Sequence, residues 1–472
     1  MKIVMVASEA NPLAKTGGLA DVVYALSKEL ARKNDVSIFM PFYRSIEDKI
    51  QDYKFIKDFT VYMSWRKVYT QLYLTNIDGI KYYLIKCDQY FSRFSLYGYD
   101  DDIERFAYFT LAVKQIMNDE KIIPDIIHIH DWQPGMLPVI IRDDKNSPLN
   151  KAKFVLTIHN PAFKGYFNPY HLGDLYGMSD EHYVDGSIKF KDNVSTLKSA
   201  IMYADKITTV SPTHRIELLY HNISDDLNYV LEFRKDDFIG VLNGIDYQEF
   251  NPRIDDKIYT KFDLRNVRNK KTINKKLLEE ELHLEVSDAP LYGMVSRLTW
   301  QKGLDILLPA IHGLLAKGSK VVILGSGEYN FEQDLENLRR EFPKNLAIYI
   351  GYNDVLAHKI YAASDFFLMP SLFEPCGLSQ MISHRYGTLP IVRRVGGLKD
   401  SVISFEGDNL DHANGFGFDE YSESAIWWTL DWCEKNYYDK KVMSQLIKNA
   451  MHANHDWKAS TKEYLKIYKQ II

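Results

Sequence analysis

The chain has 472 residues, of which 46% are hydrophobic and 26% charged, which excludes both a single small module and a disordered chain. The 58 Lys and Arg residues oppose 63 Asp and Glu residues, and the net charge of −5 excludes nucleic-acid binding by general electrostatic attraction. The aromatic content of 13% supplies flat faces that suit packed cores, sugars and nucleobases.

The cysteines and the N-terminus indicate a reducing compartment. Cys87, Cys376 and Cys433 are scattered and odd in number, which favours neither a disulfide framework nor a zinc site. The apolar stretch at residues 3–7 is too short for a signal peptide, and no apolar run approaches the ~18 residues of a membrane span. We therefore expect a cytoplasmic protein.

The first half of the chain alternates between strand and helix patterns. Residues 2–7 form an apolar run typical of a strand buried on both faces, and Gly17 and Gly18 precede a stretch with apolar residues at helical spacing. Further strands are expected at residues 36–40, 125–129, 154–158 and 207–210. This alternation predicts βαβ units around a parallel sheet.

Two other segments break the pattern. Residues 53–62, 69–76 and 80–85 read as consecutive strands around Asp78-Gly79, a hairpin signal that predicts an antiparallel extension of the first sheet. Residues 245–290 are rich in charge and predict a solvated connection. A second strand-and-helix series then follows, with strands expected at 291–296, 320–324, 346–350, 366–369 and 389–392.

Ligands in such sheets bind beyond the carboxyl ends of the strands, so the exit loops are the candidate sites. The first loop carries Lys15, Gly17 and Gly18 ahead of a helix, an arrangement that seats a phosphate. Asp131 and His159 follow later strands. His128 and His130 alternate on one strand and leave a metal site open as an alternative, although a satisfied core histidine is the simpler interpretation.

The second half offers a complementary set of residues. Arg297 and Lys302 lie five residues apart at a strand-to-helix transition, where two cations can neutralise a diphosphate. Glu374 lies at the apex of a proline-bounded loop, and the following helix start presents backbone N–H groups at Gly377, Leu378 and Ser379. For Cys376 we expect packing rather than nucleophilic catalysis, and Tyr352 offers a ring to a nucleobase.

These segments together carry a resemblance to a known family. They include KTGGLADV (15–22), HDW (130–132), TIHN (157–160), ADKITTVSP (204–212), LNGID (242–246), VSR (295–297), QKG (301–303), FEPCGL (373–378), RYGTLP (385–390) and RRVGGL (393–398). The chain resembles the bacterial glycogen synthases and plant starch synthases of glycosyltransferase family 5. Segment 219–229 departs from that pattern, because it lacks the two glycines expected there.

The resemblance implies a GT-B fold, with two Rossmann-like, doubly wound α/β domains facing each other across a deep cleft. The expected N-terminal domain covers residues 1–242 and lies on the acceptor side. The C-terminal domain covers 243–456 and lies on the nucleotide-sugar side, and a helix at about 457–472 returns to the first domain.

The resemblance also implies an activity: retaining transfer of glucose from ADP-glucose to the non-reducing end of an α-1,4-glucan, without cofactor or metal. Implied catalytic residues are Glu374, His159, Asp131, Arg297 and Lys302. Donor-binding residues are Lys15, Gly17, Gly18, Tyr352, Cys376, Gly377, Leu378 and Ser379. Tyr97 and Tyr166, each beside a glycine, are candidates for acceptor contacts. No nucleic-acid or membrane partner is expected.

Three other readings remain open at this point. UDP-glucose is the alternative donor, since choice of base rests on few contacts. A catalytically silent glucan-binding relative is possible, although Lys15, Arg297, Lys302 and Glu374 are all intact. A metal hydrolase built on His128 and His130 is the third.

Overall fold

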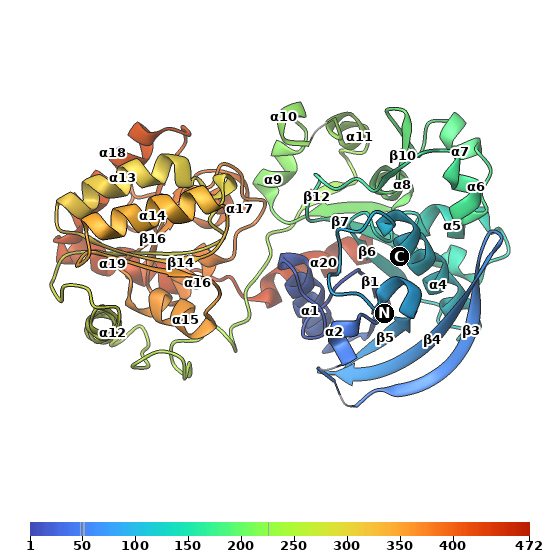
Figure 1. The fold of residues 1–472 in the computed structure, drawn as a ribbon, viewed down its shortest axis with the longest axis horizontal. Helices are drawn as coiled ribbons and strands as arrows, with labels where there is room; N and C mark the ends of the chain where they lie inside the picture. The colour runs from blue at the N-terminus through green and yellow to red at the C-terminus, as the bar shows by residue number, and fades with distance from the viewer. Residues whose placement is uncertain (48, 51, 225) are drawn as a thin grey trace. The chain divides into compact units, whose positions relative to one another are not determined.

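The computed structural model describes residues 1–47, 49, 50, 52–224 and 226–472. Within them the chain divides into two compact units (Figure 1). Unit 1 comprises Met1–Val241 together with Trp457–Ile472, and unit 2 comprises Leu242–Asp456. Both are α/β units built around a sheet, so the fold class expected from the alternation of strands and helices is confirmed.

The main sheet of unit 1 has the strand order β12-β11-β7-β6-β1-β2-β5-β4-β3. Its strands from β12 to β5 pair in parallel. Their bounds are β1 Lys2–Val6, β2 Asp35–Pro41, β5 Ile80–Lys86, β6 Ile126–His130, β7 Lys153–Ile158, β11 Lys206–Thr209 and β12 Phe238–Gly240. The expected strand at 125–129 is shifted by one residue, which makes His130 the last residue of β6.

The antiparallel extension of the sheet is also confirmed. β3 (Lys54–Met63) pairs with β4 (Arg66–Ile77), and β4 pairs with β5 through the turn at Asp78 and Gly79. Both turn residues have positive φ, 53° at Asp78 and 80° at Gly79, as a tight two-residue hairpin requires. A smaller sheet of β8 (Tyr166–Phe167), β10 (Asn193–Ser195) and β9 (Lys189–Phe190) was not expected from the sequence.

Helices cover the parallel strands, and the C-terminal helix α20 (Trp457–Ile471) packs against α1 (Gly18–Ala31) in unit 1 (Figure 1). The remaining helices of this unit are α2 Arg44–Glu47, α3 Asp88–Phe91, α4 Asp102–Asp119, α5 Leu137–Asp143, α6 His171–Tyr176, α7 Glu181–Val184, α8 Thr196–Tyr203, α9 Pro212–Glu217, α10 His221–Ser224 and α11 Asn228–Phe233. α10 lies in segment 219–229 and α11 begins there, and residue 225 of that segment lies outside the described residues.

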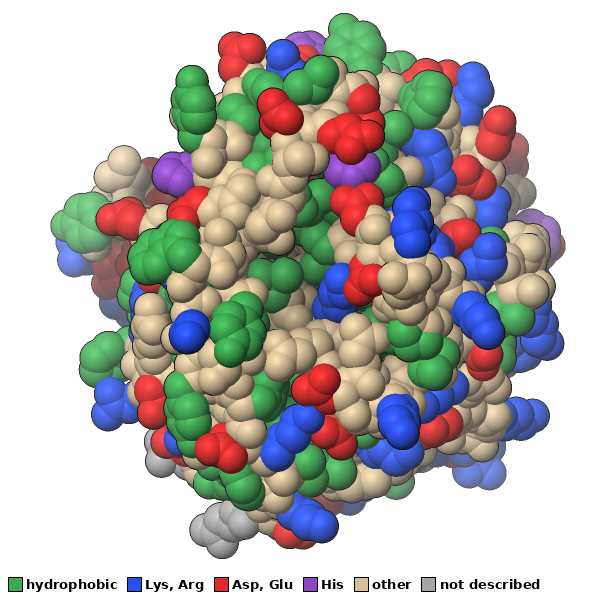
Figure 2. Space-filling model, turned by 90° about the vertical axis from the view of Figure 1, so that its right-hand side faces the viewer, with side chains coloured by type: hydrophobic (Ala, Val, Ile, Leu, Met, Phe, Trp, Pro, Cys, Tyr) green, Lys and Arg blue, Asp and Glu red, His purple; other side chains and the backbone are tan. Residues whose placement is uncertain are grey.

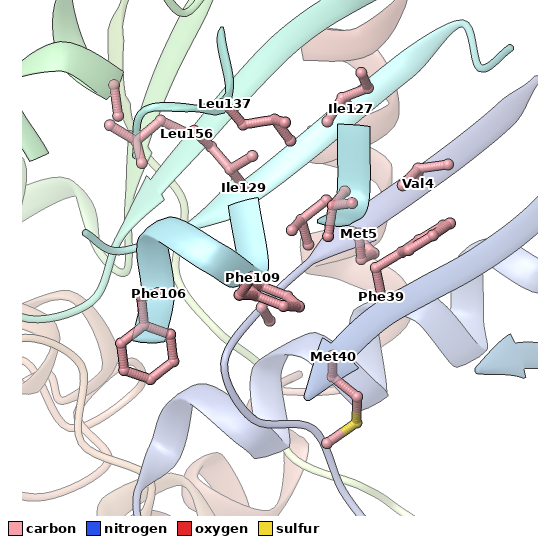
Figure 3. Packing of buried hydrophobic residues seen from close by; sticks show 14 of the residues in the cluster. Val4, Met5, Phe39, Met40, Phe106, Phe109, Ile127, Ile129, Leu137 and Leu156 are labelled. Carbon is pink, nitrogen blue, oxygen red and sulfur yellow. The ribbon is translucent and has the colours of Figure 1, made fainter. Parts of the chain in front are cut away.

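The core of unit 1 explains why its parallel strands read as continuous apolar runs. Figure 3 shows Val4 and Met5 of β1 and Phe39 of β2 beside Ile127 and Ile129 of β6, with Phe109 of α4 and Leu137 of α5 nearby. These side chains are fully buried. Burial on both faces of a sheet leaves few polar positions along a strand, and those present, such as Ser37 and His128, are themselves buried, so exposed polar groups are expected at the strand ends.

Unit 2 has an all-parallel sheet in the order β15-β14-β13-β16-β17-β18. The strands are β13 Leu291–Val295, β14 Lys320–Gly325, β15 Leu346–Ile350, β16 Phe366–Met369, β17 Leu389–Arg393 and β18 Phe416–Phe418, of which β18 was not expected. The helices are α12 Val267–Glu281, α13 Leu304–Ala316, α14 Tyr329–Glu341, α15 Asp354–Ala363, α16 Ser379–Arg385, α17 Gly396–Ser401, α18 Glu423–Tyr437 and α19 Lys440–His452.

The solvated connection expected at residues 245–290 is wrong. This segment contains α12, which packs against α15 and belongs to unit 2. Two of its lysines are buried: Lys275 Nζ lies 2.7 Å from an Asp365 carboxylate oxygen, and Lys271 Nζ donates to the Thr388 hydroxyl at 2.7 Å. Charge composition misled the prediction, because these ammonium groups find partners on strands and loops far away in the sequence.

The surface agrees with the near-neutral composition. On the face in Figure 2, acidic and basic side chains are interspersed. None of the helices among the described residues combines the length and the apolar character needed to cross a bilayer.

Candidate active site

The exit loop of β1 is held in place by a buried glutamate. Glu9 accepts hydrogen bonds from the Thr16 backbone N–H at 2.5 Å and the Thr16 hydroxyl at 2.9 Å. Lys15 is exposed, and its ammonium lies 2.8 Å from an Asp21 carboxylate oxygen. The candidate phosphate-binding lysine is therefore oriented by a partner one turn into α1.

Gly17 and Gly18 at the start of α1 are not required by packing. A Cβ atom at either position would meet no heavy atom within 4 Å, and Gly17 has an extended backbone with φ −153°. An alanine would fit the protein at both positions, so the packing gives no reason for glycine. Close approach of a ligand to the backbone N–H groups of the helix start does give one.

Asp131 ties together the exits of β6 and β7. Its Oδ1 accepts the backbone N–H of His159 at 2.7 Å and that of Asn160 at 3.3 Å. Asp131 has a φ of 56°, an uncommon backbone conformation for a residue other than glycine. Burial raises its pKa to about 7. Asp131 and His159 therefore form one polar corner of unit 1.

His128 is a satisfied core residue, as the simpler interpretation predicted. Its Nδ1 lies 2.7 Å from the Tyr468 hydroxyl and its Nε2 lies 2.6 Å from the Thr157 hydroxyl. Burial lowers its pKa to about 3. With both ring nitrogens engaged, His128 cannot bind a metal beside His130 without breaking a buried hydrogen bond, which argues against the metal hydrolase.

A different cluster among the described residues has the spacing of metal ligands, but a lysine occupies it. Donor atoms of Glu249, Asp354 and His358 lie within 4.8 Å of one another. The Lys257 ammonium lies 2.5 Å from an Asp354 carboxylate oxygen and 3.3 Å from His358 Nε2. The cluster therefore already contains its cation.

Unit 2 has a cavity of about 220 Å³ at the carboxyl ends of β13 and β16. Predicted residues lining it are Arg297, Lys302, Glu374, Gly377, Leu378 and Ser379. Residues far apart in sequence thus meet at one polar pocket, as convergence of parallel strand ends requires. Ser371 and Met369 also line it.

The centre of this pocket is an ion pair. Lys302 Nζ lies 2.5 Å from Glu374 Oε2, and the Ser371 hydroxyl donates to the same oxygen at 3.0 Å. Both charged side chains are largely buried, with exposed fractions of 16% and 10%. Arg297 is exposed, and its one hydrogen bond to a described residue goes to the Gln301 side-chain oxygen at 3.2 Å, which leaves most of its guanidinium N–H groups for a ligand.

Glycines shape the loop that carries Glu374. A Cβ at Gly396 would lie 2.0 Å from the Glu374 carbonyl oxygen, and one at Gly397 would lie 2.2 Å from that of Cys376. Gly303 has a φ of 75° and faces the Pro370 carbonyl in the same way. Unlike Gly17 and Gly18, these glycines are required for backbone segments to approach one another.

Two predicted donor residues differ from the others. Burial raises the pKa of the Cys376 thiol to about 12, which makes it a packing residue and not a nucleophile. Tyr352 follows β15 and is 88% exposed, and it is not among the residues that line the cavity. Its ring is accessible to a stacking partner.

The acceptor candidates lie in different surroundings. Tyr97 is half-buried, and its hydroxyl shares a hydrogen bond with Ser8 at 2.7 Å. It lines a second cavity, of about 400 Å³, together with Lys15 and Thr16 in unit 1. Tyr166 lies on β8, stacks on the Phe190 ring at 5.8 Å and is not among the residues lining this cavity. The structure does not bring the two tyrosines together.

Sequence reasoning missed three polar residues of the site, Glu9, Asp21 and Ser371, and the contact of His130 with His159. Glu9 and Ser371 lie close to the ends of predicted strands, so their positions could have identified them as candidate site residues. The contact between His130 Nδ1 and His159 Nε2, at 3.0 Å, joins two strands and has no local sequence signature.

Comparison with known proteins agrees with these features. Residues 2–233 match the starch synthase catalytic domain model, and residues 278–453 match the glycosyl transferases group 1 model. The chain is 42% identical to a glycogen synthase of Clostridium botulinum, covering 100% of this chain and 99% of the relative. It is 41% identical to one from Exiguobacterium sibiricum, with the same coverage.

Solved structures give the same result for the fold. The catalytic domain of starch synthase IV from Arabidopsis thaliana, solved bound to ADP and acarbose, matches with a TM-score of 0.90 and 32% identity, covering 100% of this chain and 99% of that one. Sucrose-phosphate synthase from Thermosynechococcus elongatus shares the fold, with a TM-score of 0.62 at 15% identity. The chain therefore belongs to the glycogen and starch synthases of glycosyltransferase family 5, with the GT-B fold and the glycogen synthase function of that family.

Proposed function

We propose that this enzyme transfers glucose from ADP-glucose to the non-reducing end of an α-1,4-glucan, with retention of configuration and release of ADP. The observation that carries the proposal is the pocket in which Arg297, Lys302 and Glu374 meet. The ADP bound to the Arabidopsis relative supports the choice of nucleotide.

The donor diphosphate is bound by cations and backbone N–H groups. Arg297 offers a planar fork of donors and Lys302 a point charge. The backbone at Gly377, Leu378 and Ser379 adds N–H groups at the start of α16, where the Tyr361 hydroxyl holds the Ser379 side chain at 3.0 Å. In unit 1, Lys15 and the open backbone at Gly17 and Gly18 are the proposed phosphate-binding groups.

The sugar and the base are assigned to the remaining residues. Asp131, His159 and Glu374 contact the donor glucose, and Tyr352 stacks on the nucleobase. Tyr97 and Tyr166 contact the glucan acceptor. Cys376 is proposed to help shape the donor site through its backbone, while its side chain packs in the interior. All three cysteines are free and buried, which supports a reducing cytoplasmic location.

The mechanism follows from the charge balance of the pocket. Glu374 Oε2 is already bonded to Lys302 and Ser371, so this carboxylate holds the cation in place and is not positioned by the fold as a free nucleophile. Departure of ADP leaves negative charge on the phosphate, which Arg297 and Lys302 stabilise. The acceptor hydroxyl attacks from the same face and passes its proton to the leaving phosphate. No step requires a metal.

Competing nucleotide sugars test the substrate. Purified enzyme is incubated with glycogen and labelled ADP-glucose or UDP-glucose, and label incorporation is measured with and without EDTA. We expect incorporation from ADP-glucose that EDTA leaves unchanged. Preference for UDP-glucose would reassign the donor, and loss of activity in EDTA would overturn the metal-free mechanism. The anomeric configuration of the first product, read by NMR, tests retention.

Glu374→Gln tests the role of the ion pair. The amide keeps the shape but removes the counter-charge of Lys302, and loss of a charge-assisted hydrogen bond costs about 1.5–3 kcal/mol, or roughly 10- to 150-fold in kcat. Glu341→Gln at the exposed end of α14 is the matched control and is expected to keep full activity. Full turnover by Glu374→Gln would contradict the assignment.

A further inference from the structure

Two neighbouring strand ends of unit 1 bring a pair of histidine rings together. His130 Nδ1, at the end of β6, lies 3.0 Å from His159 Nε2, beyond the end of β7. Burial lowers the pKa of His159 to about 3 and that of His130 well below its usual value, so both rings are neutral near pH 7. Two neutral rings at this distance share one hydrogen, so one nitrogen donates and the other accepts.

The buried side of His130 decides which ring donates. His130 Nε2 is fully buried and has no hydrogen-bond partner among the described residues. A hydrogen on this nitrogen would be a buried donor without an acceptor, whereas a bare nitrogen leaves only an unused lone pair. A buried N–H group without an acceptor is rarer in proteins than a buried acceptor without a donor, and it costs more free energy. The hydrogen of His130 therefore lies on Nδ1 and is donated to His159 Nε2.

The tautomer of His159 follows directly. Its Nε2 is the acceptor and carries no hydrogen, so the single hydrogen of the neutral ring is on Nδ1. Over the part of the chain that the structure describes, no hydrogen bond is recorded for this nitrogen, and the residue is only partly buried. His159 thus presents an N–H donor, and not an acceptor, toward solvent.

The surroundings hold the pair rigidly. His130 stacks on His128 with ring centroids 4.4 Å apart and an interplanar angle of 24°. His128 is bonded on both sides, to Thr157 of β7 and to Tyr468 of α20. The rings therefore have little freedom to rotate and exchange roles.

We propose that His130 is a positioning residue that fixes His159 as the Nδ1–H tautomer, so that His159 donates a hydrogen bond to an oxygen of the sugar substrate. This deepens the proposed function and rests on it for the identity of the sugar. The tautomer itself does not depend on that function, so the two can fail separately.

A second histidine pair provides an internal control of opposite polarity. In unit 2, His384 Nδ1 lies 3.0 Å from His455 Nε2, and His384 Nε2 lies 3.0 Å from the Asn414 carbonyl oxygen. The carbonyl can only accept, so His384 carries its hydrogen on Nε2 and His455 donates from Nε2. His455 and His159 should therefore be opposite tautomers.

The first experiment reads the tautomers without using activity. The full chain is labelled with ¹⁵N-histidine, ring nitrogen shifts are recorded at pH 7.5, and His159 and His455 are assigned from the spectra of His159→Gln and His455→Gln. We expect a protonated Nδ1 in His159 and a protonated Nε2 in His455. A protonated Nε2 in His159 would overturn the proposal, even if ADP-glucose is the donor.

The second experiment tests the consequence for transfer. His130→Asn places an amide donor near the position of Nδ1, whereas His130→Leu removes it. We expect His130→Leu to lower kcat about tenfold with little change in the KM for ADP-glucose, and His130→Asn to restore most of the loss. Equal loss in both variants, or wild-type kcat in a folded His130→Leu, would refute the positioning role. If the wild type uses no nucleotide sugar, the proposed function fails while the NMR result stands.

Discussion

Gly18 provides a direct test of whether the start of α1 binds a ligand. A Cβ atom there would meet nothing within 4 Å, so Gly18→Ala leaves the packing of the protein intact. Alanine is the better helix former, and at this first helical residue it is expected to raise the free energy of unfolding by up to about 0.5–1 kcal/mol. The same methyl group would stand between the backbone N–H groups and an approaching phosphate.

The expected cost to binding follows from one lost contact. A hydrogen bond to a charged group contributes about 1.5–3 kcal/mol, and each 1.4 kcal/mol is a factor of ten, so the KM for ADP-glucose should rise roughly 10- to 150-fold. Stability and donor binding should therefore change in opposite directions in one variant. Initial rates against ADP-glucose concentration and urea unfolding measure the two quantities.

Gly303→Ala is the matched control, because that glycine serves the fold. Its φ is 75°, and a Cβ would lie 2.1 Å from the Pro370 carbonyl oxygen. The left-handed backbone alone costs about 1–2 kcal/mol for alanine, before the clash. This variant should lose stability. An unchanged donor KM in Gly18→Ala, with stability retained, would refute the argument that its glycine is kept for a ligand.

Three further outcomes are expected. The Cys376 thiol, with a pKa raised to about 12 by burial, should resist iodoacetamide at pH 7.5, so activity survives prolonged treatment and rapid inactivation at that residue would contradict burial. Burial raises the pKa of Asp131 from 3.8 to about 7, so the folded state binds more protons than the unfolded state. The free energy of unfolding should therefore fall as pH rises from about 4 to 7. Asp131→Asn should flatten this dependence, measured by urea titrations at several pH values. Glu279→Leu leaves the fully buried Lys320 ammonium without its ion-pair partner and should lower the free energy of unfolding by about 3–5 kcal/mol. Urea denaturation measures this quantity, and an unchanged value would show that stability does not depend on the pair.

The parallel sheets were predictable because strands that are buried on both faces appear in the sequence as short, mostly apolar runs. β1 is apolar from Ile3 to Val6 and β6 is apolar except for its two histidines, and the candidate residues were found at or just beyond the strand ends. Strand order could not be read in the same way, since it depends on which faces meet after the chain has folded. The short strands β8, β9 and β18 escaped prediction because two or three residues carry no periodicity.

The segment taken for a solvated link shows the limit of composition. α12 has a low mean hydrophobic content, yet it buries Lys271, Lys275 and Glu279. Burial is tolerable because each charge meets a partner: Thr388, Asp365 and Lys320 respectively. Those partners lie 117, 90 and 41 residues away along the chain, so no local pattern could reveal them.

Within the candidate site, residue identities could be predicted but their pairing could not. Lys302 and Glu374 were both predicted as site residues, because each lies in a loop that follows a strand. That the two form a buried ion pair with Ser371 depends on the approach of two separate loops. The hydrogen bond between His130 and His159 has the same origin. Parallel strands bring the ends of distant segments together, and this convergence creates contacts that sequence spacing does not encode.

The pairing changes how the cations should be understood. Lys15 is held by Asp21 at 2.8 Å and Lys302 by Glu374 at 2.5 Å, so neither lysine is a free positive charge waiting for an anion. A singly charged anion should bind weakly beside either lysine, because the neighbouring carboxylate already neutralises the ammonium and repels a second negative charge. A diphosphate brings more than one negative charge and several acceptor oxygens, and in the unit 2 pocket it would use the remaining Lys302 ammonium N–H groups, the guanidinium of Arg297 and the backbone at Leu378 together. Under the proposed function, we therefore expect partial neutralisation of the cations to favour a multiply charged leaving group, in keeping with a chain whose net charge is only −5.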